Sequence, residues 1–226
     1  MARATVQPVT ELADPAAEAG ELAFRFGAGR PCLDLVLTVG ERWRRSFERL
    51  RQPADLGRWL VDAGLVSPSP AAAAEDLAGA RELREAIFGI ARSAMDGVRP
   101  GRADVRVVNA WAARPDLRPA LVRVGGPVRR GSADPVGAAL STLARDAVEL
   151  FGSSLAGRVR ECGAPDCSSV FLDRSRAGRR RWCSMAACGN RSKVAAYRRR
   201  RSAPARDRTG VHAARAAAPP GTSRGR

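Results

Sequence analysis

The chain has 226 residues, of which 45% are hydrophobic and 27% charged, and its formal net charge is +16. This apolar content is sufficient for a folded core, and the length suits one medium domain with a small appended module. No stretch approaches the ~18 consecutive apolar residues that a transmembrane helix needs, which excludes membrane-spanning helices. Glu11, Asp14 and Glu18 occupy positions that are apolar in a secretory signal, so we expect a cytoplasmic protein.

The positive charge is concentrated in the last third of the chain. Residues 155–226 contain 18 Lys and Arg against 4 acidic residues, a net charge of +14, whereas residues 1–154 contribute only +2. A field concentrated in this way favours a polyanionic partner, with nucleic acid first and an anionic membrane surface second. The alternative is a solvated basic tail that improves solubility.

The first part of the chain predicts short elements. Residues 1–21 are polar and rich in alanine, which is typical of a loose N-terminal segment. Residues 24–26 alternate in polarity and precede two glycines, which indicates a short strand and a turn. The dense apolar run from Leu33 to Trp43, after a proline, predicts a buried helix. Residues 53–64 predict a short helix that starts at a proline and stops at a glycine.

The middle of the chain is mainly helical with one hairpin. Residues 73–97 show the most regular amphipathic pattern, and a shorter helix is expected over residues 105–115. Residues 121–130 predict a β-hairpin with two glycines in a two-residue turn, and the helical period returns over residues 135–151. We therefore expect a mainly α-helical domain with a small β-hairpin over residues 22–154. The apolar stripe of the long helix contains Ala80, Leu83, Ile87, Ile90 and Ala94, with Arg81, Arg84 and Glu85 outside it.

Four cysteines in two equally spaced pairs follow this domain. Four residues separate Cys162 from Cys167, and four separate Cys183 from Cys188. In a reducing compartment such pairs indicate a metal site before disulfides. Four thiolates at tetrahedral corners are typical of a structural Zn²⁺ site without an open position. We expect one structural zinc ion; an iron–sulfur cluster and a redox disulfide switch are the alternatives, and the switch is compatible with zinc.

The cysteine pairs define a small module over residues 158–201. Short strands at Val159 and at residues 170–172 bracket the first pair, and a helix is expected from about Gly189 to Arg201. Because the module has few apolar residues, bound zinc should supply its folding energy, on the order of 10–16 kcal/mol. Residues 202–226 predict a disordered basic tail. The chain is therefore α+β, with a treble-clef or zinc-ribbon-like finger after the helical domain.

Basic residues flank the cysteines on both sides. On a helix, Val194 and Tyr197 lie about 60° apart and are expected to pack inward. Cys188 cannot belong to a regular helix, and Gly189 allows the chain to turn there. Arginine bonds two phosphate oxygens at once, which suits nucleic acid. The predicted nucleic-acid contacts are Arg179, Arg180, Arg181, Arg191, Lys193, Arg198, Arg199, Arg200 and Arg201.

These motifs resemble a known module, the CGNR zinc finger. The matching segments are Arg158-Val-Arg-Glu-Cys-Gly-Ala-Pro-Asp-Cys167, Phe171-Leu-Asp, Arg181-Trp-Cys-Ser-Met185 and Cys188-Gly-Asn-Arg191. In that family the finger follows an N-terminal domain called ABATE, and the first domain here is similar to it. The stretch from Phe24 to Asp34 and Leu56-Gly-Arg-Trp-Leu60 carry that similarity. The polar Asn of the family's Leu-Asp-Phe-x-Asn-Thr stretch is replaced by Leu37.

The resemblance implies a DNA-binding, stress-related transcription regulator in bacteria, associated with the nucleoid. It places zinc on Cys162, Cys167, Cys183 and Cys188. The helical domain would then sense a small-molecule effector or form a homodimer. For Asn190 we favour a role in tying the turn into the helix over a base contact. A zinc-stabilised module that binds RNA or protein is the alternative function.

Catalysis is not expected from this sequence. The only histidine is His212 in the predicted tail, so no Ser/His or Cys/His pair can form in the core. Asp34 and Asp173 are single carboxylates without an identifiable partner. Cys32 is expected to be a small buried thiol. We expect neither an enzyme nor a membrane partner.

Overall fold

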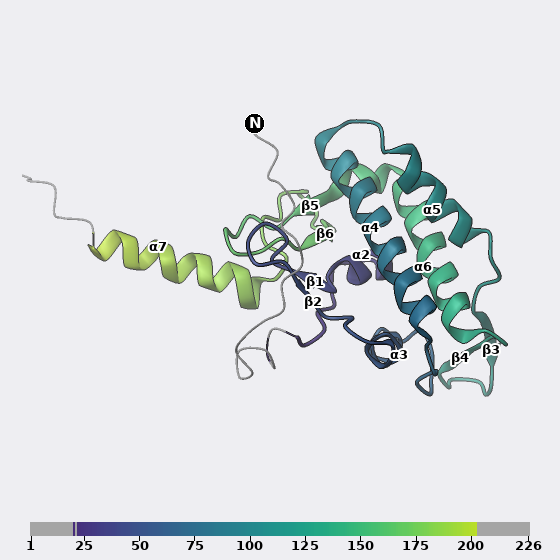
Figure 1. Cartoon of the computed structure of the whole chain (residues 1–226). Helices are drawn as coiled ribbons and strands as arrows, with labels where there is room; N and C mark the ends of the chain where they lie inside the picture. Colours follow the sequence, from purple (N-terminus) through teal and green to yellow (C-terminus); the bar gives the residue numbers. More distant parts are fainter. Residues whose placement is uncertain (1–19, 21, 203–226) are drawn as a thin grey trace, which may run out of the picture. The chain divides into compact units, whose positions relative to one another are not determined.

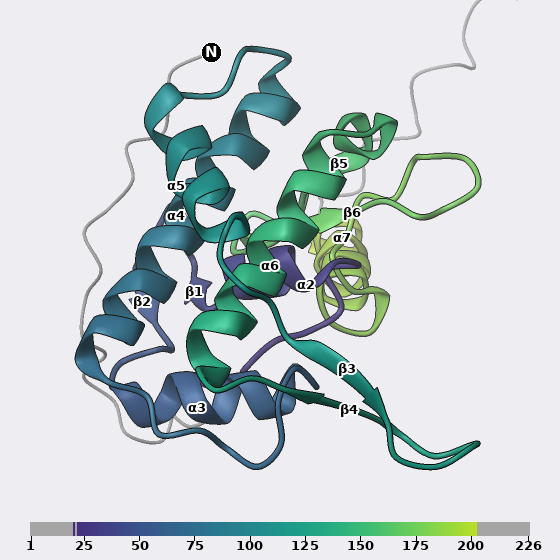
Figure 2. The ribbon, with the colours of Figure 1, turned by 90° about the vertical axis from the view of Figure 1, so that its right-hand side faces the viewer.

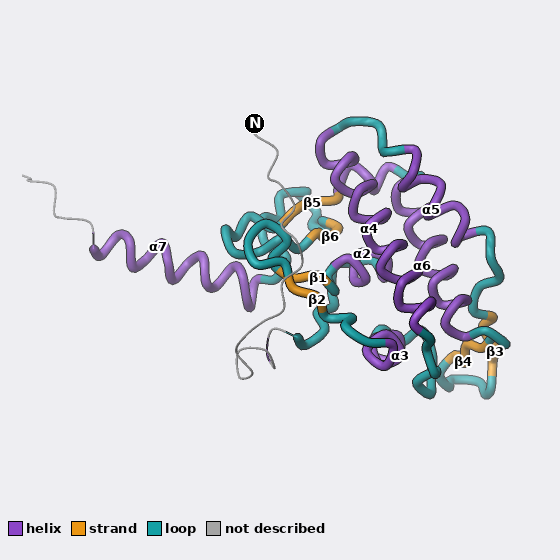
Figure 3. Tube along the Cα trace, in the orientation of Figure 1, coloured by secondary structure: helices purple, strands orange, loops and turns teal. Residues whose placement is uncertain are grey.

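The computed structural model describes residue 20 and residues 22–202. It divides into two compact units, one ending at Asn190 and the other beginning at Arg191. Helices predominate, and the strands of the described residues form three separate two-stranded antiparallel sheets, as expected for an α+β chain (Figure 3). Within these residues no helix is both long and apolar enough to cross a membrane.

Three helices form the body of the first unit. α4 (Ala74–Asp96), α5 (Arg102–Ala112) and α6 (Pro135–Phe151) lie side by side, and each contacts the other two (Figures 1 and 2). Their facing sides are apolar, with Leu83 and Leu143 fully buried. The three helices lie close to the bounds predicted from their amphipathic patterns, because their apolar stripes are buried against one another.

Two shorter helices complete this core. α2 (Pro31–Val36) contacts α4 and α6, and α3 (Pro53–Asp62) also contacts both. Pro31 and Pro53 occupy the first helical turns, where the missing N–H has no intrahelical partner. Gly64 follows α3 with φ +69°, as predicted for a C-terminal glycine.

The predicted strand over residues 24–26 is wrong. These residues make no strand, because their aromatic side chains contact α3 instead: Phe26 stacks on Trp59 at 6.0 Å, and Arg58 lies over Phe24. Gly27 and Gly29, which follow, both adopt the left-handed backbone, with φ +93°.

The predicted buried helix from Leu33 to Trp43 is also too long. α2 ends at Val36, and β1 (Val39–Gly40) then pairs with β2 (Phe47–Glu48). Side chains satisfy the carbonyls at this end: the Thr38 hydroxyl donates to Leu35 O at 2.7 Å, and Arg49 donates to Leu37 O at 2.8 Å. These bonds replace the next helical turn.

The hairpin has a longer loop than predicted. β3 (Arg118–Leu121) pairs with β4 (Val128–Gly131), and Leu121 faces Val128, so six residues connect the strands. Gly126 N donates to Arg123 O in a turn at the tip. Pro127 has no N–H for the ladder, which explains why pairing begins only at Val128.

Arg84 is a further correction, because it is buried although the pattern placed it outside the apolar stripe. Its guanidinium bonds Glu48 at 2.8 Å and Glu85 at 2.7 Å, and only 3% of the residue is exposed. β2 supplies Glu48 to this side of α4, which a helical periodicity alone does not reveal.

Candidate metal centre

The first cysteine pair lies in a knuckle between two strands. After η1 (Ser154–Arg158), β5 (Val159–Glu161) pairs with β6 (Val170–Leu172), as predicted. Cys162 N donates to Ser169 O at 2.9 Å, and Cys167 N donates to Ala164 O at 3.1 Å. These bonds fold the connecting loop back on itself, so both sulfurs face the same side.

The second pair is placed by a wide helical turn. Cys188 lies in η2 (Met185–Gly189), a π-helical turn in which Gly189 N donates to Ser184 O at 2.9 Å. The prediction that Cys188 is not part of a regular helix is thus confirmed. A Cβ at Gly189 would lie 2.9 Å from Met185 Sδ, and because Met185 is exposed and flexible, its side chain could move to make room.

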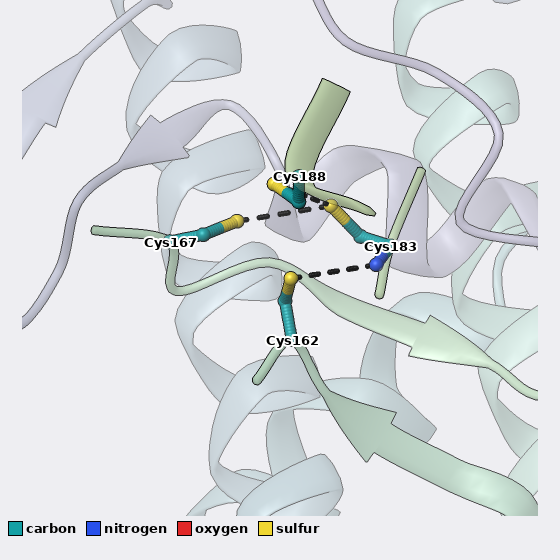
Figure 4. A group of neighbouring side chains, drawn as sticks. All are labelled: Cys162, Cys167, Cys183 and Cys188. Carbon is teal, nitrogen blue, oxygen red and sulfur yellow. Dashed lines mark hydrogen bonds between the residues drawn. The ribbon is translucent and has the colours of Figure 1, made fainter. Parts of the chain in front are cut away.

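The four sulfur atoms fit a tetrahedral ion. All four lie within 4.8 Å of one another (Figure 4), and Cys183 Sγ is 3.7 Å from Cys167 Sγ and 3.6 Å from Cys188 Sγ. Four sulfurs about 2.3 Å from one Zn²⁺ lie about 3.8 Å apart, which agrees with these separations. The four cysteines therefore form one structural zinc site, as predicted.

The thiols of this cluster differ in acidity. Hydrogen bonds from Cys162 and Cys183 lower the pKa of Cys167 far below the ordinary thiol value. The pKa of Cys183 is raised, first through its hydrogen bond with Cys162, and burial raises the pKa of Cys188 to about 12. Zinc must displace the protons held by these two thiols, so binding releases protons.

Arg180 and Asp173 hold the chain that leads to Cys183. Arg180 Nε donates to Trp182 O at 2.9 Å and Nη2 to Cys183 O, and its guanidinium lies 4.7 Å from the Phe171 ring centroid. The Asp173 carboxylate accepts from Ser175 N at 2.8 Å and Arg180 N at 2.9 Å, and its hydrogen bonds with Ser175 lower its pKa. Asp173 thus has partners that the sequence did not identify.

The centre is attached to the helical core through the residues next to its ligands. Glu161, which precedes Cys162, accepts hydrogen bonds from Trp43 Nε1 and, at 2.7 Å, from Arg92 of α4. Ser168, which follows Cys167, accepts from Arg42 N at 2.9 Å. The knuckle is therefore bonded to α4 before the first cysteine pair and to the β1–β2 connection after it.

The apolar residues of β5 and β6 belong to the same core as the helices. Val159, Val170, Phe171 and Leu172 are at most 1% exposed and join the apolar cluster that contains α2, α4 and α6. The expectation that the module depends on zinc alone neglected this shared burial. The sequence could not show it, because the strands are too short to indicate their partner.

The segment between the two cysteine pairs is a basic loop, defined here as residues 173–182. Of the predicted nucleic-acid contacts on this loop, Arg179 and Arg181 are exposed, whereas Arg180 is half-buried. Arg174 and Arg176 are also exposed on this loop. The prediction omitted these two, although five arginines within eight residues were visible in the sequence.

α7 (Asn190–Ser202) follows η2 and matches the predicted helix. Arg191, Lys193, Arg198, Arg199 and Arg201 are exposed, and the side chain of Arg200 is outside the described part of the structure. The predicted inward packing of Val194 and Tyr197 is wrong: they are 48% and 53% exposed. Among the described residues of this unit, 191–202, no second apolar element is present to bury them. At the start of α7, Asn190 Nδ2 donates to Ala186 O at 3.2 Å, which favours the turn-tying role.

The remaining candidates have structural surroundings. Asp34 accepts from Ala28 N at 2.8 Å, and burial raises its pKa to about 6. Cys32 is fully buried, as predicted, and burial raises its pKa well above the ordinary value. Its backbone N–H donates to Asp146 at 2.9 Å. His212 lies outside the described residues.

Comparison with family models agrees with this architecture. Residues 29–154, more than half of the chain, match the ABATE model, described as "Putative stress-induced transcription regulator". Residues 158–201 match the CGNR zinc finger model. Comparison with curated proteins gave no match. Since the first match spans the helical domain and the second spans the four-cysteine centre, the chain belongs to the ABATE family and carries a CGNR zinc finger after that domain.

Proposed function

We propose that this protein is a transcription regulator that binds duplex DNA through two basic elements, the basic loop and α7. A regulatory zinc-binding protein fits both family matches. In this proposal zinc is structural: it holds the knuckle, η2 and the ends of the basic loop in place. The helical domain then serves as the sensing or dimerisation part.

The charge of α7 is the observation that carries this proposal. The helix has six basic residues and no acidic residue among its 13. Like charges on neighbouring helical positions are destabilising, and a helix of this length is marginal by itself in water. Phosphate groups would remove that repulsion, so a polyanion stabilises α7 more than water does.

The basic loop supplies a second set of cations close to the zinc ligands. Arg174, Arg176, Arg179 and Arg181 are exposed, and within the described ranges none of them forms an ion pair with an acidic residue. A loop anchored by its buried carboxylate and by Arg180 presents these side chains in a restricted arrangement. Arg180 is left out of the proposed contacts, because its guanidinium is used by carbonyl groups of the loop.

Binding is favoured over catalysis by the chemistry of the centre. Four thiolates leave Zn²⁺ without an open coordination position, so the ion has no place for a reacting water. The chain's single histidine, His212, is far in sequence from the centre. A DNA-binding role would place the protein in the cytoplasm at the nucleoid.

A salt titration of DNA binding tests the proposal. Replacing Arg198 and Arg199 by alanine should reduce the slope of log affinity against log salt by up to about 1.8, because each phosphate contact contributes about 0.9. The control R99A/R102A removes two exposed arginines, one from the α4–α5 connection and one from the start of α5, and should leave the slope unchanged.

Fragments selected from genomic DNA by the zinc-loaded protein should bind about 10³-fold or more tightly than random sequence. Equal affinity for all duplexes would contradict a regulator. Preference for RNA over DNA would favour the alternative function.

A further inference from the structure

The β3–β4 ribbon, residues 118–131, carries exposed apolar side chains that the fold does not use. Both strands are exposed along their whole length, and the ribbon extends away from the helices to its tip (Figure 2). Val124, at the tip, is 91% exposed, and Leu121 is 73% exposed. Such a cluster on a projecting element indicates a partner surface.

The same ribbon is strongly basic. It contains Arg118, Arg123, Arg129 and Arg130 and no acidic residue. The acids on either side are engaged elsewhere: Asp116 pairs with Arg145 at 3.3 Å, and Asp134 accepts from Gly137 N at 2.9 Å at the start of α6. The ribbon therefore has a local charge of +4 without neutralising side chains of its own.

This charge argues against a second copy of the chain as the partner. Antiparallel pairing of β4 with the β4 of another copy would place Arg129 and Arg130 beside the same residues, and like charges on adjacent strands are destabilising. β3 contains Pro119, which has no N–H to donate to an added strand. A polyanion would attract these arginines, whereas a second copy of the ribbon would repel them.

We propose that the β3–β4 ribbon is a DNA-binding arm that contacts phosphates through its arginines and inserts its apolar tip into the minor groove. Two-stranded ribbons enter DNA grooves, and minor-groove proteins combine arginines with apolar side chains that wedge between base steps. The inference rests on the proposed function but concerns a different surface, which neither family match assigns to DNA.

Within the first unit the arm lies far from the cysteine centre, so it would contact a different stretch of DNA. The ribbon precedes the start of α6, and β5 follows its end, so arm and cysteine centre lie at opposite ends of that helix (Figure 1). A helix of 17 residues spans roughly 25 Å, because each residue rises 1.5 Å. Contacts by the arm should therefore lengthen the protected DNA beyond the contacts of the basic loop.

The test uses the full zinc-loaded chain, a mixed-sequence DNA duplex, and affinity measured against salt. R129A/R130A should lower the salt slope by up to about 1.8 and shorten the hydroxyl-radical footprint, whereas R129K/R130K should keep the slope. Val124→Ser removes the apolar wedge and changes no charge, so it should weaken binding with an unchanged slope. R99A/R102A is the matched control, and an unchanged melting temperature shows that each variant is folded.

Each outcome has a defined meaning. If R129A/R130A kept the wild-type slope and footprint while R198A/R199A lowered the slope, the proposal of a DNA-binding arm would be overturned and the proposed function would stand. An equal loss of slope in R99A/R102A would also overturn the arm, because the effect would then come from the net charge of the chain rather than from the ribbon. A wild-type chain that binds no DNA would overturn both proposals. Val124-dependent binding to phosphatidylserine vesicles, with DNA affinity unaffected by the ribbon variants, would replace the arm by a membrane surface.

Discussion

Phe171→Ala tests whether the zinc centre and the helices form one folding unit. Phe171 lies in β6, three residues before Arg174, the first arginine of the basic loop, and its side chain is completely buried. Its ring contacts the guanidinium of Arg180, which in turn holds Cys183 O. The substitution therefore removes core volume and weakens the support of one zinc ligand.

The expected loss of stability is large. Truncation of a buried phenylalanine to alanine costs about 3–5 kcal/mol, since the transfer free energy is lost and a cavity remains. For a folded unit of this size, each 1 kcal/mol lowers the melting temperature by about 2–4 °C, so the decrease should be about 6–20 °C. Because β6 shares the core of α2, α4 and α6, this decrease should affect the helices and the finger together.

Far-UV circular dichroism and zinc release to a chromogenic chelator, followed in one thermal scan, measure this directly. The helical transition and the release of zinc should move together to lower temperature. Leu121→Ala, at a 73% exposed position, is the control and should change stability by less than about 0.5 kcal/mol. If zinc left early while the helices melted as in the wild type, the finger would be an independent module and the shared-core reasoning would be refuted.

Three further predictions concern the titratable groups. Cys183→Ser should abolish the one zinc per chain measured by metal analysis, whereas Cys32→Ala should retain it; retention in the first variant would contradict the assigned ligands. Zinc affinity should increase with pH, since the raised pKa values of Cys183 and Cys188 mean that zinc must displace their protons, and a pH-independent affinity would oppose this. Asp34→Asn should stabilise the protein by about 1–2 kcal/mol at pH values above the Asp34 pKa, as measured by thermal unfolding. The sign follows from the raised folded-state pKa of about 6: stability from protonated Asp34 is complete below its usual value of 3.8 and is lost as the pH rises through 6, so a variant effect that does not fade toward low pH would be inconsistent.

The long helices and the metal ligands could be predicted because their signals are local. α6 has its predicted bounds, Pro135 to Phe151, since an apolar stripe and a first-turn proline both lie within the helix. The cysteine spacing is likewise sufficient to predict the metal site, because four sulfurs around one ion leave little freedom to the short loops within each pair. These features depend on neighbours a few residues away.

The errors occurred where distant segments decide the local structure. α2 stops at Val36 because Thr38 bonds the carbonyl of Leu35 and Arg49 bonds that of Leu37 just beyond the helix, and Arg49 is 12 residues from the carbonyl that it bonds. Arg84 is buried because β2 brings Glu48 to it, 36 residues away in sequence. No periodicity contains such information, since the contacts form only after the chain has folded.

The sequence by itself determined the zinc ligands, the helical class of the first domain and the location of the positive charge, because residue type and spacing are sufficient for each. Only the tertiary structure decided that β5 and β6 are buried with the helices and that Arg180 supports the loop. It also showed that the β3–β4 ribbon leaves Val124 exposed beside its arginines. These three facts depend on which surfaces meet, and that is a property of the packed chain.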